Sequence, residues 1–160
     1  NSIIANCSNN YGPWQHPEKL IPKIILNAIN RKQIPIYGKG KNVRDWIHVD
    51  DHVNALIKIL KKGKIGEMYN IGGRNEKTNI SIAMLICDLL DEIYDNGYSH
   101  KKLIKYVVDR PGHDFRYAVN DSKIRTRLNF KNKIDFKYGI KHTIKWYIKK
   151  NKFFSTKFKI

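Results

Sequence analysis

Alternation between extended and helical patterns is the feature that most constrains the fold of this chain. Five segments are predicted as helices, at residues 18–32, 50–62, 79–94, 122–130 and 137–150. Short β-rich runs separate most of them, at residues 2–6, 34–37, 44–49, 67–73 and 103–109. Strands that alternate with helices predict an α/β fold. With 160 residues, no internal repeat and no linker, the chain is expected to form about one domain.

Local signals predict where the helices begin and how deeply they are buried. Pro22 is tolerated only near the first turn of a helix, which places a helix start just before it. Asp50 or Asp51 is placed to cap the second helix. The segment that begins at Asn79 is predicted as the longest helix, and apolar residues on nearly all its sides predict deep burial.

Composition bounds the class of protein. A hydrophobic content of 41% and a charged content of 28% are typical of a folded chain. No apolar run approaches the roughly 20 residues needed to span a bilayer, so no membrane partner is expected. Cys7 and Cys87 have neither metal-site nor disulfide spacing, and both are expected as small buried side chains in a reducing, cytoplasmic compartment. The first residues resemble a strand entered midway, so we expect the natural N-terminus to lie upstream.

A net charge of +17 raises the possibility of nucleic-acid binding. Most of this charge is lysine spread along the whole chain, and it is denser only near the C-terminus. No zinc-finger spacing or RNA-recognition signature accompanies it. We therefore expect no nucleic-acid partner, although a basic binding module remains an alternative.

Two asparagines are candidate ligand contacts near the start of the chain. Asn9 and Asn10 follow the first β-rich run, and ligands of open α/β sheets collect at the carboxyl ends of strands. A side-chain amide can both donate to and accept from a sugar or phosphate oxygen. The alternative is an Asx-turn in which the amides only hold the loop. Lys19, at the start of the first helix, is either a ligand contact or a surface charge.

Arg44 is one of few arginines among many lysines. Its planar guanidinium suits bidentate recognition of phosphate, which a lysine does not reproduce. The alternative is a structural ion pair with Asp45, Asp50 or Asp51.

The stretch from Asp109 to Tyr117, DRPGHDFRY, places an arginine at the end of a predicted strand. Pro111 fixes its own φ and favours an extended Arg110, while Gly112 permits a sharp reversal. The pattern indicates a preorganised arginine beside His113, and the alternative is a surface loop with salt bridges.

Several motifs of catalysis and cofactor binding are missing from the sequence. The glycines at residues 38–40 and 71–73 match neither a dinucleotide fingerprint nor a P-loop. Tyr98 and Lys102 have the spacing of a short-chain dehydrogenase pair, but they lie in a predicted loop, so we interpret the match as coincidence. No metal site and no Ser-His-Asp or Cys-His arrangement is indicated.

Four segments together resemble one family. They are NCSNNYGPWQHPEKLIP, PIYGKGKNVRDWIHVDDH, GEMYNIGGRNEKTN and DRPGHDFRYAVNDSKI. In this order and spacing they resemble the dTDP-glucose 4,6-dehydratases, in the nucleotide-sugar branch of the extended short-chain dehydrogenases/reductases. The resemblance implies the C-terminal part of an NAD(P)-binding Rossmann fold, with its last parallel strands and a mixed α/β substrate-binding lobe. Residues 1–160 would form a single substrate-binding portion, with the N-terminal NAD-binding part absent.

The family reaction converts dTDP-glucose into dTDP-4-keto-6-deoxyglucose through bound NAD. The resemblance places the glycine-rich loop, the acid/base segment and the Tyr-x-x-x-Lys pair upstream, so no catalytic residue is assigned here and the chain alone is expected to be inactive. A homodimer is expected for the full-length protein. A UDP-sugar dehydratase and an inactive remnant are the alternatives.

The resemblance also implies binding positions. Asn9 would contact substrate and Asn10 the NAD side of the site. Arg44 and Arg110 are predicted to bind the diphosphate. The other implied substrate positions are Lys19, Leu20, Pro35, Ile36, Tyr37, Asn79, Asp109, Pro111, Gly112 and His113.

Overall fold

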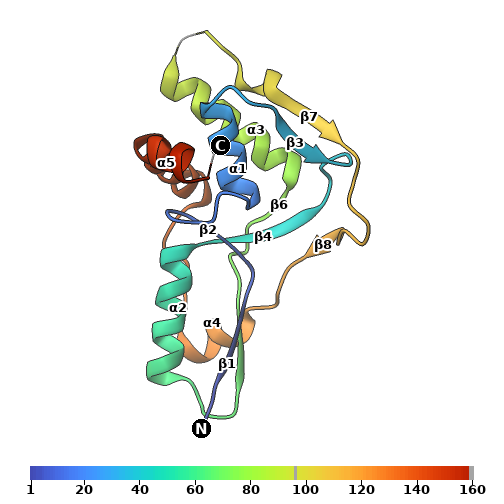
Figure 1. Ribbon diagram of the computed structural model, residues 1–160. Coiled ribbons are helices and arrows are strands. Elements are labelled where there is room, and N and C mark those ends of the chain that lie inside the picture. The colour runs from blue at the N-terminus through green and yellow to red at the C-terminus, as the bar shows by residue number, and fades with distance from the viewer. Residues whose placement is uncertain (96, 159–160) are drawn as a thin grey trace.

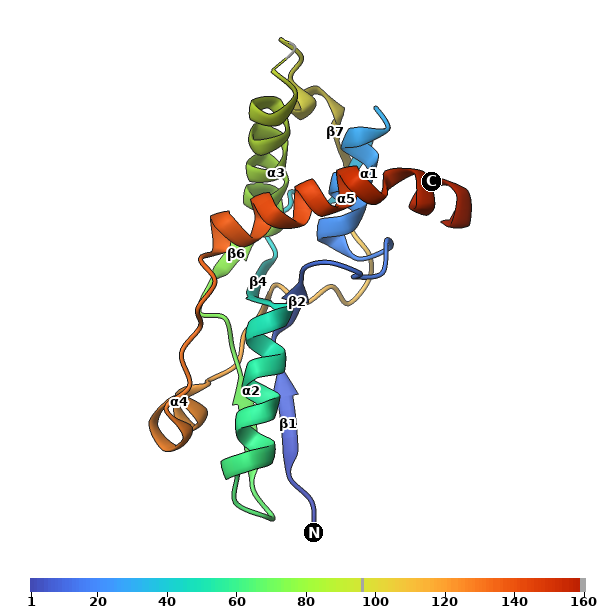
Figure 2. The same cartoon turned by 90° about the vertical axis from the view of Figure 1, so that its left-hand side faces the viewer.

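The computed structural model describes residues 1–95 and 97–158 (Figures 1 and 2). Its strands are β1 (Ile4–Cys7), β2 (Asn9–Tyr11), β3 (Ile34–Tyr37), β4 (Val43–His48), β5 (Met68–Ile71), β6 (Glu76–Thr78), β7 (Ile104–Val107) and β8 (Arg116–Tyr117). Its helices are α1 (Leu20–Ile29), α2 (Val49–Lys62), α3 (Asn79–Tyr94), α4 (Ser122–Leu128) and α5 (Phe136–Phe158), with a 3₁₀ turn η1 (His100–Leu103). None of the helices described has the length and apolarity that a membrane crossing requires.

The strands form three small sheets in which most pairs are parallel. In the first, β1 runs beside β5, and in another β3 runs beside β7, both parallel. The sheet between them is organised by β4, which pairs in parallel with β2 and β8 and antiparallel with β6. Helices alternate with these strands along the chain, which confirms the predicted α/β class.

The segment after β1 differs from the prediction. Residues 9–11, expected as a loop, form β2 and pair with Trp46–His48 of β4. The Ser8 N–H still bonds to the Ile71 carbonyl at 2.9 Å, and the chain then leaves β5 for β4. Periodicity could not reveal this step from one sheet to another, because it requires a partner strand more than thirty residues away.

Two hydrophobic cores hold these elements. The upper core packs α1, α3 and α5 around Trp46, and α5 lies across α1 and α3 (Figure 2). The apolar stripe predicted for α1 is buried there, and Pro22 lies in its first turn as expected. The lower core joins α2, α4, β1 and β5 (Figure 1). Its buried members are Ile47, Ala55, Ile59, Tyr69, Ile71, Ile124, Leu128 and Phe130.

Two predictions about helix ends are wrong. The first turn of α2 is capped by His48, whose Nδ1 accepts the Asp50 N–H at 3.2 Å. Asp51 is buried, and its carboxylate instead accepts the backbone N–H groups of Lys133 and Ile134 at 3.0–3.1 Å. Its role therefore depends on a segment eighty residues away, which a local capping rule cannot detect.

The longest helix is α5 with 23 residues, not α3 with 16. The sequence predicted that this last helix would end at residue 150. Phe154 is nevertheless buried, and its ring lies 5.2 Å from that of Tyr147, so the apolar stripe continues for two more turns. Helix α3 begins at Asn79 and is well buried, as predicted.

An apolar surface remains uncovered at the lower end of the molecule. Leu60 of α2 is 83% exposed, and Ile4 of β1 and Met68 of β5 are also exposed. Within the described part of the chain, β1 and β5 pair only with each other. Parallel sheets are normally covered on both faces, so this surface has the character of an interior side.

Candidate functional site

A pocket of about 430 Å³ lies where the middle sheet meets the starts of α1 and α3. Its wall combines strand residues with the loop after β7. The lining residues are Asn9, Glu18, Lys19, Leu20, Lys23, Pro35, Tyr37, Arg44, Trp46, Asn79, Arg110 and His113. Elements far apart in sequence thus bring together nine of the thirteen predicted substrate positions, the four outside the lining being Ile36, Asp109, Pro111 and Gly112.

Strand alternation decides which side chains reach this pocket. Arg44 and Trp46 of β4 line it, two residues apart on one face. Pro35 and Tyr37 do the same on β3. Ile36 between them is 1% exposed and belongs to the upper core, so its side chain lies away from the pocket.

Arg44 is a buried cation, 8% exposed. Its guanidinium donates to the carbonyls of Val43 at 2.7 Å and Asp114 at 2.9 Å. Within the described part of the chain it forms no ion pair with a carboxylate. A buried charge held only by two carbonyls is costly, and a bound anion would compensate it.

The ion-pair alternative for Arg44 fails, because two of the three candidate aspartates accept backbone N–H groups and the third is exposed to solvent. Asp45 accepts the backbone N–H groups of Gly73 and Asn75, each at 2.8 Å. The Asp50 side chain is 71% exposed to solvent, and Asp51 accepts the backbone N–H groups of Lys133 and Ile134.

The loop that carries Arg110 is held by its own aspartate. Asp109 Oδ1 lies 2.7 Å from His113 Nδ1 and accepts the Arg110 N–H at 2.9 Å. The hydrogen bond from His113, with a smaller contribution from the Arg110 N–H, holds the pKa of Asp109 below its usual value. Gly112 has φ +67°, the reversal predicted for it. Asp109, Pro111 and Gly112 therefore shape the loop, while Arg110 and His113 line the pocket.

Charge and ring chemistry indicate what the pocket accepts. Lys19, Lys23, Arg44 and Arg110 contribute four positive charges against one carboxylate, Glu18. Such an excess favours a ligand with more than one negative charge. Tyr37 and His113 form an aromatic wall, with their ring centroids 6.5 Å apart. This wall offers a surface on which a planar ring of a ligand can pack.

Asn10 lies outside this pocket. Its side-chain amide donates to Ser8 O at 3.2 Å and to Cys7 Sγ at 3.3 Å, which stabilises the step from β1 to β2. Its Oδ1 is buried and has no hydrogen-bond partner in the described part of the chain. Lys102 lies in η1, and Tyr98 lies under the Arg31 guanidinium at 3.5 Å, so neither lines the pocket.

Three pocket residues were not predicted from the sequence: Glu18, Lys23 and Trp46. A spacing signal in the sequence could have indicated two of them. Lys23 follows Lys19 by one helical turn, and Trp46 follows Arg44 by one strand repeat. Glu18 has no such signal beyond its position next to Lys19.

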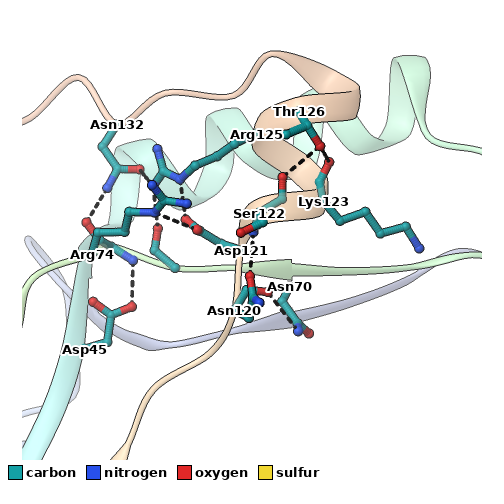
Figure 3. A network of polar contacts seen from close by, with 12 residues as sticks. Asp45, Asn70, Arg74, Asn120, Asp121, Ser122, Lys123, Arg125, Thr126 and Asn132 are labelled. Carbon is teal, nitrogen blue, oxygen red and sulfur yellow. Dashed lines mark hydrogen bonds and ion pairs between the residues drawn. The ribbon is translucent and has the colours of Figure 1, made fainter.

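A polar network lies on the other face of β4 (Figure 3). Asp121 is buried and accepts from Arg74 Nε at 2.9 Å and from Arg125 Nε at 2.5 Å. Asn132 donates to the Gly73 carbonyl at 2.6 Å, and Asp45 accepts the Gly73 N–H. A Cβ on Gly73 would lie 1.7 Å from the Trp46 carbonyl. The network thus holds the glycine turn tightly against β4, the strand that carries Arg44 and Trp46.

Comparisons with known proteins match this arrangement. A family model described as GDP-mannose 4,6 dehydratase matches residues 1–143. The dTDP-glucose 4,6-dehydratase 1 of Escherichia coli K12 is 53% identical over 151 residues, covering 94% of this chain and 42% of that protein.

Solved structures agree with the sequence matches. The Bacillus anthracis dTDP-glucose 4,6-dehydratase in complex with NAD has a TM-score of 0.85 and 47% identity, and the match covers 94% of this chain and 45% of that chain. The Streptomyces venezuelae enzyme, with NAD and dTDP bound, has a TM-score of 0.87 and 38% identity at the same coverage. This chain therefore spans less than half the length of these proteins.

The comparisons confirm the resemblance found in the four motifs and the fold class that it implied. The structure is part of a Rossmann-type α/β unit, as in the NAD-binding extended short-chain dehydrogenases/reductases. Because the family model covers residues 1–143 of 160, the chain belongs to the GDP-mannose 4,6 dehydratase family.

Proposed function

We propose that this chain is the sugar-nucleotide-binding portion of a dTDP-glucose 4,6-dehydratase, the enzyme that forms dTDP-4-keto-6-deoxyglucose. The observation that carries the proposal is Arg44, a buried cation without a carboxylate partner in the described chain, on the wall of a pocket with three further cations. The name of the Escherichia coli relative supports the choice of dTDP-glucose.

Each part of the ligand has a matching part of the pocket. Arg44 and Arg110 bind the two phosphates, because forked cations suit adjacent phosphate oxygens. Tyr37 and His113 contact the base or its ribose. Asn9 and Asn79 supply amides that can pair with hydroxyls of the sugar.

The described residues fit only one edge of an NAD site. Asn10 offers a buried, unpaired acceptor beside the step between two sheets, and the chain has no glycine-rich phosphate loop. When bound, NAD would supply the hydride chemistry, and this chain's own residues would bind and orient the sugar nucleotide. We propose that an N-terminal Rossmann part packs on the exposed apolar surface of β1, β5 and α2. A cytoplasmic homodimer of the full-length protein also remains our proposal.

Calorimetric titration of the 160-residue chain tests the binding claim. We expect dTDP-glucose to bind with strong salt dependence, and UDP-glucose to bind more weakly. A folded chain, verified by circular dichroism, that binds no sugar nucleotide would overturn the proposal. Equal or tighter binding of UDP-glucose would move the assignment to a UDP-sugar enzyme.

An activity assay tests whether this chain only binds the substrate and depends on the N-terminal part for catalysis. The isolated chain should form no 4-keto sugar in a spectrophotometric assay. A chimera that joins it to the portion of the Escherichia coli enzyme that it does not match should form the product. Activity of the isolated chain would contradict the proposal that the catalytic residues lie in the N-terminal part.

A further inference from the structure

Trp46 belongs to the upper core and also lines the pocket, and it has a polar indole N–H without an assigned role. It lies in β4, is 2% exposed, and stands opposite Asn9 in the register of β2 and β4. Trp46 is one of the residues that line the pocket. Its indole N–H is buried and donates no hydrogen bond to any of the described residues.

An unpaired indole N–H of this kind requires an explanation. The group can only donate, and buried tryptophans usually find an acceptor for it. Leaving a buried donor unpaired is costly, because the group loses its hydrogen bonds to water and gains none in the protein. A replacement of Trp46 by an apolar residue would avoid this cost, so packing alone does not account for the indole.

The neighbours of Trp46 indicate what would pair with it. Arg44, on the same face of β4, is the buried cation proposed to bind phosphate. Asn79 lines the same pocket, and its Oδ1 is also buried and unpaired within the described chain. The pocket thus holds one unpaired donor and one unpaired acceptor near a phosphate-binding arginine. Oxygens of a diphosphate or of the attached sugar can accept from the donor, and sugar hydroxyls can also donate to the acceptor.

We propose that Trp46 is a specificity-determining contact whose indole N–H donates to an oxygen of the diphosphate–sugar part of the ligand. This inference rests on the proposed function. Because the nitrogen is enclosed, a neighbouring side chain of the pocket wall must move when the ligand binds. The contact therefore selects ligands that carry an oxygen acceptor at this depth of the pocket.

Nuclear magnetic resonance of the full chain, labelled with ¹⁵N at the indoles, tests the contact directly. The chain has three tryptophans, and Trp46→Phe assigns one of the three indole signals. We expect dTDP-glucose to move the Trp46 signal downfield. Trp14 and Trp146, whose rings lie 4.9 Å apart in the cluster near the end of α5, should not respond. Titrations with thymidine, dTDP and dTDP-glucose then separate base, phosphate and sugar as the source of the acceptor.

Calorimetry provides the second measurement. Trp46→Phe should weaken dTDP-glucose binding about 3- to 30-fold, the range of one buried hydrogen bond, while Trp146→Phe should leave the affinity unchanged. An unmoved Trp46 signal in a wild-type chain that binds dTDP-glucose overturns this inference and leaves the proposed function intact. A response to thymidine alone also overturns it. A wild-type chain that binds no dTDP-glucose overturns both. The wild-type spectrum answers the question even where Trp46→Phe does not fold.

Discussion

Replacing Arg44 by glutamine gives the sharpest test of the pocket. The side chain is 8% exposed and donates to two backbone carbonyls at 2.7 and 2.9 Å. Glutamine keeps a donor group and removes the charge. The change therefore separates what the arginine does for the ligand from what it does for the fold.

The two expected magnitudes differ in size. A hydrogen bond to a charged group contributes about 1.5–3 kcal/mol. Since about 1.4 kcal/mol corresponds to a factor of ten, Arg44→Gln should weaken dTDP-glucose binding roughly 10- to 150-fold. The fold loses part of two hydrogen bonds but no longer buries an unpaired charge, an effect of opposite sign. We expect the free energy of unfolding to change by less than about 1 kcal/mol.

The assay compares Arg44→Gln with Arg127→Gln. Arg127 lies in α4, its side chain is 63% exposed, and its replacement removes the same charge without touching the pocket. Calorimetric titration with dTDP-glucose measures affinity, and urea unfolding measures stability. Equal losses of affinity in both variants would show that only net charge matters. A large loss of stability in Arg44→Gln would show that the arginine is a structural group, and the reasoning about the pocket would be refuted.

Three further predictions concern the framework. Burial lowers the pKa of His48, so the unfolded chain protonates first as pH falls below about 6.5, the ordinary value. The free energy of unfolding, measured by urea titration, should therefore fall between pH 7 and 5. His48→Asn, which can still cap α2, should make this pH dependence weaker. An unchanged pH dependence would refute the role of His48. Gly73→Ala should lower the free energy of unfolding by at least about 3 kcal/mol, because its Cβ would lie 1.7 Å from the Trp46 carbonyl oxygen. A thermal unfolding midpoint close to that of the wild type would contradict this prediction. Burial raises the pKa of Cys87 to about 12. A thiol reagent at pH 8 should therefore label only Cys7 until urea is added. Fast labelling of both cysteines would show that the upper core opens.

Much of the secondary structure was predictable because its signals are local. The periodic stripe of α1, the start of α3 at Asn79 and the extent of β3 all follow from spacing within one segment. The errors occurred where a distant partner decides. Residues 9–11 form a strand because they pair with β4. The Asp51 carboxylate accepts the backbone N–H of Lys133 instead of capping α2.

In the candidate site, too, local features were predictable and features that depend on distant partners were not. Residue chemistry selected Arg44, Arg110 and the asparagines, and the four motifs together indicated the family. Spacing can place Lys23 beside Lys19 and Trp46 beside Arg44, but it cannot show that both pairs reach the same pocket, because they lie on different elements. The resemblance implied Ile36 as a substrate position, but strand alternation places its side chain in the core.

The sequence by itself determined the α/β class, most elements and the residue types that can bind an anionic sugar nucleotide, since periodicity, turn chemistry and motif order act over short distances. Only the tertiary structure decided that Arg44 is buried without a carboxylate partner in the described chain and that the Trp46 N–H has no acceptor there. Burial and pairing depend on which distant groups surround a side chain. Those are the properties that turn a set of polar residues into a binding site.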